Sequence, residues 1–115
     1  MRPGQLHPNE LEEALLNRLG LEHPDEQIAI RDLCVISRTF TGVGSFTEFR
    51  VKGQRPVPRR VLNSSALVTI PGLQHGLGVV AFREGSTLTL ETFTIGDERW
   101  DGVFDGFAVL REAGE

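Results

Sequence analysis

Leucines recur at every fourth position between residues 11 and 19, which gives one apolar stripe with helical spacing. Asn9 stands just before the stripe and is a good N-cap residue, and Glu12 occupies the capping-box position three residues later. Gly20 follows the stripe and favours a helix end. The pattern predicts a helix over residues 10–19.

The residues that follow this helix predict a second helix and then a strand. Pro24 followed by two acids is typical of a helix start, and we expect a short helix over residues 24–31. The run from Leu33 to Ile36 is apolar and rich in β-branched residues, which favours a strand over residues 33–41.

The rest of the chain alternates between apolar and polar positions or forms short apolar runs. The connection Arg83–Ser86 contains a glycine between two such runs and indicates a hairpin. The further strands are expected at residues 46–51, 61–70, 77–82, 87–93 and 107–110. Helices first and strands afterwards predict an α+β fold, in which two N-terminal helices pack on a curved antiparallel sheet of five or six strands.

Size and composition favour one domain over residues 1–115, with loose ends at 1–8 and 112–115. The chain has 115 residues, 39% of them hydrophobic, which suffices for one core. The one cysteine, Cys34, lies between apolar neighbours and is expected to be a buried, unreactive thiol. We see no signal peptide and no apolar run long enough to span a membrane, so the expected compartment is the cytoplasm.

The stretch TGVGSFTEF, residues 41–49, has the glycines and hydroxyl residues of a phosphate-binding loop. Such a loop also needs a lysine and a following helix whose N-terminus faces the phosphate. Here no lysine follows, and the next segment has strand periodicity. We therefore expect the glycines to supply positive φ angles in a turn between two antiparallel strands.

The formal net charge is −4, but its distribution is uneven. Residues 50–60 carry five of the 12 basic residues, together with two prolines and a glycine, which predicts a cationic loop. Surface pairing with acids from the rest of the chain is the simplest interpretation. The acidic balance does not favour nucleic-acid binding.

The only tryptophan of the chain lies in a polar loop among acids. In the first of two interpretations, Trp100 is an exposed anchor for a basic protein partner, and the partner-binding set is Asp97, Glu98, Trp100 and Asp101. In the second, Trp100 folds back over the edge of the sheet and its indole N–H donates to a loop carbonyl.

The preferred function is a small protein-binding module, of the kind that immunity or inhibitor proteins represent, which occupies a basic partner surface. The alternative is a small enzyme or ligand-binding protein that uses Glu48, His75 and Glu91 near the glycine-rich turns. The three histidines lack metal-ligand spacing, and we expect no metal and no cofactor. An uncovered edge strand could also pair with a second copy of the chain.

Three segments together resemble a pattern found in short, uncharacterised single-domain bacterial proteins. They are SRTFTGVGSFT at residues 37–47, GLQHGLG at 72–78 and LETFTIGDERW at 90–100. The resemblance implies a stand-alone bacterial protein of the cytosol. It implies no activity, substrate or catalytic residue.

Overall fold

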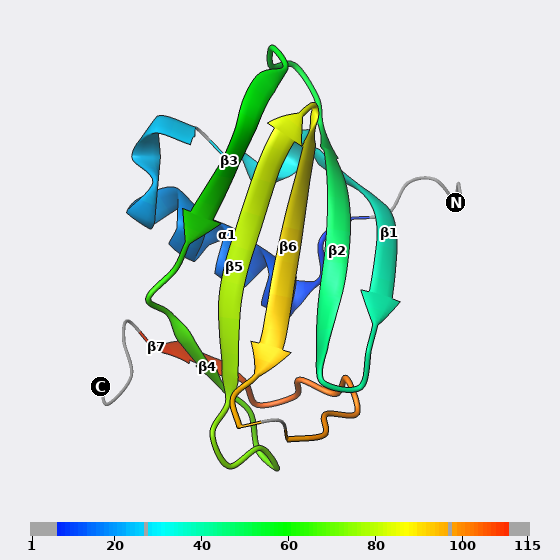
Figure 1. Ribbon diagram of the computed structural model, residues 1–115, viewed down its shortest axis with the longest axis vertical. Coiled ribbons are helices and arrows are strands. Elements are labelled where there is room, and N and C mark those ends of the chain that lie inside the picture. The colour runs from blue at the N-terminus through cyan, green and yellow to red at the C-terminus, as the bar shows by residue number, and fades with distance from the viewer. Residues whose placement is uncertain (1–6, 27, 97, 111–115) are drawn as a thin grey trace.

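The computed structural model describes residues 7–26, 28–96 and 98–110, which form one α-helix followed by an antiparallel sheet (Figure 1). Helix α1 (Glu10–Glu22) begins at the predicted capping box: Asn9 Oδ1 accepts from the Glu12 N–H at 2.8 Å, and Glu12 Oε1 accepts from the Asn9 N–H at 2.9 Å. The predicted end at Gly20 is wrong. The helix continues to Glu22 and ends at His23, because Pro24 disfavours helical geometry in the residue before it.

The prediction of a second α-helix is also wrong, because the segment has another type of structure. The segment forms two single 3₁₀ turns, η1 (Pro24–Glu26) and η2 (Ile30–Asp32), and Ala29 between them is extended. A helix of this length is marginal on its own, and the isoleucines around Ala29 add little helix propensity. Where two helices were predicted, the structure therefore has one α-helix and two 3₁₀ turns.

The sheet has seven strands within the described residues, rather than five or six. Their bounds are β1 (Leu33–Phe40), β2 (Gly44–Val51), β3 (Val57–Asn63), β4 (Leu67–Thr69), β5 (Leu77–Gly85), β6 (Thr87–Thr94) and β7 (Ala108–Leu110). The order is β1-β2-β6-β5-β4-β7, and β3 also pairs with β5. The strand expected at 61–70 is two strands, because the long strand β5 pairs with β4 near its start and with β3 along the rest of its length.

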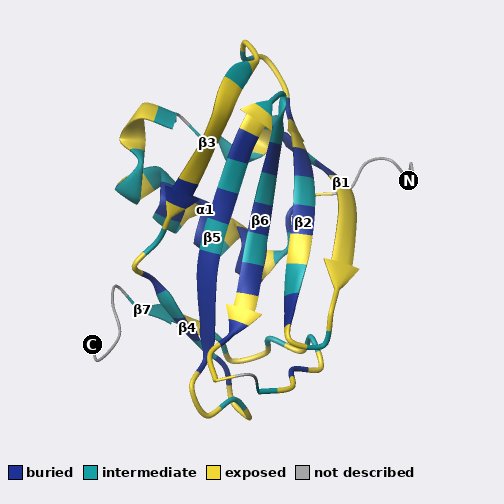
Figure 2. Ribbon diagram, viewed as in Figure 1, coloured by how far each residue is buried: buried dark blue, intermediate teal, exposed yellow. Residues whose placement is uncertain are grey.

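Helix α1 lies behind the sheet in Figure 1 and covers one face, which we call the inner face. Alternate residues of the central strands point into this core, as the alternating burial in Figure 2 shows. The largest fully buried side chains are Phe49, Leu15, Leu16, Leu19, Leu77, Leu88, Leu90 and Val68. The opposite, outer face is not covered by α1.

A β-bulge in β1 changes which of its side chains reach the inner face. Val35 pairs with Phe49, and Ser37 pairs with Glu48, the neighbour of Phe49 in β2. Ile36 is therefore an extra residue of β1 without a partner in β2. Strict alternation from Val35 would direct Ser37 inward. The bulge reverses the alternation, and Arg38, paired with the buried Thr47, lies on the inner face instead.

The glycine-rich stretch forms the β1–β2 hairpin, which confirms the turn prediction. Gly42 has φ +86°, a conformation that favours glycine. Gly44 serves a different purpose: a Cβ atom there would lie 2.1 Å from the Thr92 carbonyl oxygen, so only glycine allows β2 and β6 to approach this closely. Strand β1 is an edge of the sheet, and its pairing with a second copy stays a prediction.

Candidate ligand-binding cavity

A cavity of about 280 Å³ lies between the first turns of α1 and the inner face of the sheet at its β1 end. The loop between β6 and β7 contributes Trp100, Gly102 and Phe104 to its lining. Its apolar lining comes from Leu11, Leu15, Phe40, Leu90, Trp100 and Phe104. Its polar lining includes Glu12, Arg38, Ser45, Thr47 and Thr92. The volume is close to the lower end of the range for small-molecule sites, and the mixed lining is typical of them.

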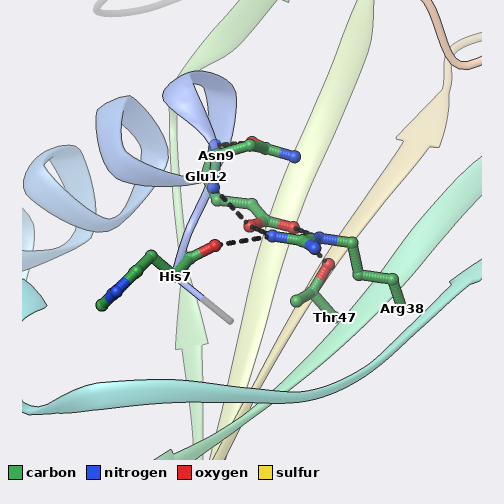
Figure 3. A network of polar contacts seen from close by, with 5 residues as sticks. All are labelled: His7, Asn9, Glu12, Arg38 and Thr47. Atoms are coloured by element: carbon green, nitrogen blue, oxygen red, sulfur yellow. Dashed lines mark hydrogen bonds and ion pairs between the residues drawn. The ribbon is translucent and has the colours of Figure 1, made fainter. Parts of the chain in front are cut away.

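The polar lining of the cavity includes an ion pair between Glu12 and Arg38 (Figure 3). Arg38 Nη2 donates to Glu12 Oε1 at 2.7 Å, and Arg38 Nε donates to Glu12 Oε2 at 2.8 Å. Thr47 Oγ1 donates to Glu12 Oε2 at 2.7 Å, and the Asn9 N–H donates to Oε1. The carboxylate therefore accepts four hydrogen bonds, and it links α1 to strands β1 and β2.

These contacts determine the charge state of the pair. Burial disfavours the ionised carboxylate, but the hydrogen bonds from Arg38, Asn9 and Thr47 outweigh it, and the pKa of Glu12 lies below its ordinary value. The hydrogen bonds to Glu12 in turn raise the pKa of Arg38. Both groups are charged near neutral pH, and the pair is neutral as a whole.

Hydrogen-bond donors remain for a ligand among the residues that line the cavity. Arg38 Nη2 also donates to the His7 carbonyl at 3.0 Å, but within the described part of the chain Arg38 Nη1 has no acceptor. Ser45 Oγ and Thr92 Oγ1 lie 2.6 Å apart and share one hydrogen bond. Because each hydroxyl carries one hydrogen and only one is used between them, the other can be donated to a bound molecule.

Two aromatic rings border the opening of the cavity. Trp100 is only 6% exposed, and its indole N–H donates to the Val103 carbonyl at 2.9 Å. The Phe40 ring packs edge-on against Trp100, with ring centroids 5.5 Å apart, and is itself 48% exposed. This is the fold-back geometry of the second interpretation of Trp100.

The acids proposed as partner-binding residues have local structural contacts. Glu98 accepts from the backbone N–H groups of Gln74 and His75, each at 2.8 Å, and these hydrogen bonds lower its pKa. Asp101 Oδ1 accepts from the Val103 N–H at 2.9 Å. Asp97 lies outside the described residues. Partner binding by this set stays a prediction.

The three polar residues of the alternative prediction do not form one cluster. Glu48 and Glu91 share the outer face, as diagonal neighbours across β2 and β6. His75 is exposed in the β4–β5 loop, beyond the pairing of Leu77 with Thr94. Glu91 pairs with Val80, three strand positions or about 10 Å from Leu77, and His75 lies beyond Leu77 in the loop.

The basic segment at residues 50–60 is only partly a loop, because β3 begins at Val57. Arg60 pairs with Glu26 at 3.2 Å, and the Arg59 guanidinium lies 5.3 Å from the centre of the Phe82 ring. Cys34 is of intermediate exposure rather than fully buried. In the described ranges no group of three or more acids, histidines or cysteines is placed to hold a metal ion.

Sequence reasoning missed the residues that make the polar lining of the cavity. Glu12 was recognised only as a capping residue, and Arg38, Thr47 and Ser45 were not singled out. The partners are far apart in sequence: Arg38 lies 26 residues after Glu12, and Thr47 lies 35 residues after it. The sequence offered one indication of this site: Glu12 lies at the start of the predicted helix, on the same turn as the first leucine of the apolar stripe.

The comparisons give no family for this chain. It matches none of the family models, curated proteins or solved structures with which it was compared. No helix of the described residues has the length and apolar character needed to cross a membrane.

Proposed function

We propose that the protein binds a small, largely apolar molecule in the cavity between α1 and the inner face of the sheet. The observation that carries this proposal is the lining itself, in which aromatic and leucine side chains are combined with a few polar groups. A few well-placed polar groups in an apolar pocket orient a ligand and select it. The proposal takes up the ligand-binding alternative, with different residues from Glu48, His75 and Glu91.

Binding fits this site better than catalysis. The four hydrogen bonds to Glu12 occupy its carboxylate, and its lowered pKa keeps it ionised near neutral pH, so it is poorly suited to donate or accept a proton. The hydroxyl pair of Ser45 and Thr92 has no general base among its described hydrogen-bond partners.

The test uses the indole N–H of Trp100, which gives a single, unambiguous NMR signal because the chain has one tryptophan. ¹⁵N-labelled protein is titrated with three probes that share one ring system: 1-naphthamide, 1-naphthoate and 1-naphthylmethylamine. We expect at least one probe to shift the indole signal saturably, and Phe40→Ala to weaken that binding by about fivefold or more through lost contact area.

Phe46→Ala is the matched control, because Phe46 is exposed to a similar degree on the outer face and does not border the cavity. It should leave the affinity unchanged. The proposal fails if no probe binds, or if the two variants, both shown by circular dichroism to be folded, weaken binding equally.

A second proposal retains the protein-binding module and moves it to the outer face. Phe46 and Phe93 are 40% and 42% exposed there, and Glu48 and Glu91 lie beside them. An aromatic anchor next to acids suits a basic partner surface, as the sequence analysis suggested for the loop at Trp100. An immunity or inhibitor role would act through such a surface.

The two surfaces are distinguished by affinity capture from the source lysate with Phe93→Ala, Glu91→Lys and Phe40→Ala as baits. A partner of this face should be lost with Phe93→Ala and Glu91→Lys and kept with Phe40→Ala. Recovery of the same proteins by all three baits would contradict the second proposal.

A further inference from the structure

From the charges around the cavity we infer that its ligand is uncharged and presents a hydrogen-bond acceptor, such as an amide or ketone carbonyl, to Arg38 and the Ser45–Thr92 hydroxyl pair. This inference rests on the proposed function and specifies the class of ligand. Glu12 and Arg38 are the charged side chains among the described residues that line the cavity, and they already neutralise each other.

The hydrogen-bond inventory points to an acceptor on the ligand. The Glu12 carboxylate is occupied by four donors from the protein, whereas Arg38 Nη1 and one hydroxyl hydrogen remain to be donated. A carbonyl oxygen has two lone pairs and no hydrogen to donate, so it is the type of group that such donors bind. An apolar body would then lie against Phe40, Trp100 and the leucines of α1.

The neutrality of the ion pair argues against a charged ligand. A carboxylate at Arg38 Nη1 would be attracted by the guanidinium, but Glu12, bound to the same guanidinium, would repel it. The two effects largely cancel, and the loss of hydration of the ligand charge would remain uncompensated. An ammonium group would face the donors of Arg38 and find the one carboxylate already occupied.

The same three naphthyl probes test this ranking. We expect 1-naphthamide to bind the wild type at least about tenfold more tightly than 1-naphthoate or 1-naphthylmethylamine. The double variant Ser45→Ala/Thr92→Val should weaken naphthamide binding by about threefold to tenfold, the value of one hydrogen bond, because either hydroxyl alone would still have a hydrogen to donate. Ser37→Ala, a serine on the outer side of β1, is its matched control and should have no effect.

A variant of the counter-charge tests the electrostatic argument directly. Glu12→Gln gives the cavity a net positive charge, so naphthoate should bind it about tenfold or more tightly than it binds the wild type. Circular dichroism establishes whether this variant is folded under the titration conditions. If the variant is unfolded, the relative affinities of the three probes for the wild-type protein decide whether the inference holds.

The outcomes separate the inference from the proposed function. Naphthoate or the amine binding the wild type as tightly as naphthamide, with the same dependence on Phe40, would overturn the neutral-ligand inference and leave the cavity as a binding site. If no probe binds in a manner that depends on Phe40, the proposed function fails and this inference falls with it.

Discussion

Glu12→Gln is the most informative single change for the stability of the protein. The Glu12 side chain is 7% exposed and accepts hydrogen bonds from two Arg38 nitrogens, the Thr47 hydroxyl and the Asn9 N–H. Glutamine has nearly the same shape, but it removes the charge and turns one acceptor into a donor. In either orientation of the amide, one Arg38 nitrogen would then face another donor, and so would either the Asn9 N–H or the Thr47 hydroxyl.

The burial of the ion pair determines how much unfolding free energy the change removes. Removing one partner of a buried ion pair lowers the free energy of unfolding by roughly 3–5 kcal/mol. The Arg38 side chain is 37% exposed, so water can solvate part of the guanidinium that the change leaves unpaired. We therefore expect a loss at the lower end of that range, about 3 kcal/mol near neutral pH.

The loss should depend on pH. Because the folded state lowers the pKa of Glu12, the unfolded chain binds more protons in the acid range, and the stabilisation by Glu12 is complete above its ordinary pKa of 4.5. It disappears as the pH falls through the lower pKa of the folded state. The difference in unfolding free energy between wild type and Glu12→Gln should shrink accordingly.

Urea denaturation followed by far-UV circular dichroism measures this difference between about pH 7 and about pH 2. Glu13→Gln is the control, since Glu13 is exposed on the same helix turn, and its loss should be about 0.5 kcal/mol or less. A loss for Glu12→Gln no larger than that of the control, or one that does not change with pH, would refute the reasoning.

Three further changes test the helix, the strand pairing and the packing of Trp100 by the same denaturation assay. Gly20→Ala should stabilise the protein by about 0.5–1 kcal/mol, since Gly20 lies inside α1 and a Cβ atom there meets nothing within 4 Å; no gain would contradict this. Gly44→Ala should destabilise it by about 2 kcal/mol or more, because the added Cβ collides with the Thr92 carbonyl, and wild-type stability would show that β2 and β6 are less closely paired. Trp100→Phe should lower stability by about 1–2 kcal/mol through loss of the hydrogen bond to Val103 and part of the ring, whereas a neutral effect would indicate that Trp100 is exposed in solution.

Short sequence patterns predicted those elements that are determined by interactions between residues close together in the chain. The capping box at Asn9 and Glu12 marked the start of α1 correctly, because both hydrogen bonds form within four residues. Alternation located β2 and β6, and the hairpin signal located β5 before β6; the inner faces of these strands are buried by the core. The end of α1 was wrong because the glycine signal at Gly20 is weak when good helix formers follow it.

The cavity could not be predicted, because it depends on register and on long-range contacts. Alternation from Val35 directs Ser37 inward, and only the unpaired Ile36 brings Arg38 to Glu12. Nothing in the residues around Arg38 indicates that extra position. The burial of Trp100 likewise depends on Phe40, which lies far away in sequence, while the acids beside Trp100 suggested exposure.

The bulge at Ile36 also affects how strand β1 can meet other chains. An edge strand exposes a regular row of backbone donors and acceptors, which favours aggregation. In β1 this row breaks into Leu33–Val35 and Ser37–Phe40, which are out of phase with each other. A foreign strand without a matching irregularity can therefore align with only one short run at a time. The extra residue that orients Arg38 toward the cavity thus also protects the sheet against unintended extension.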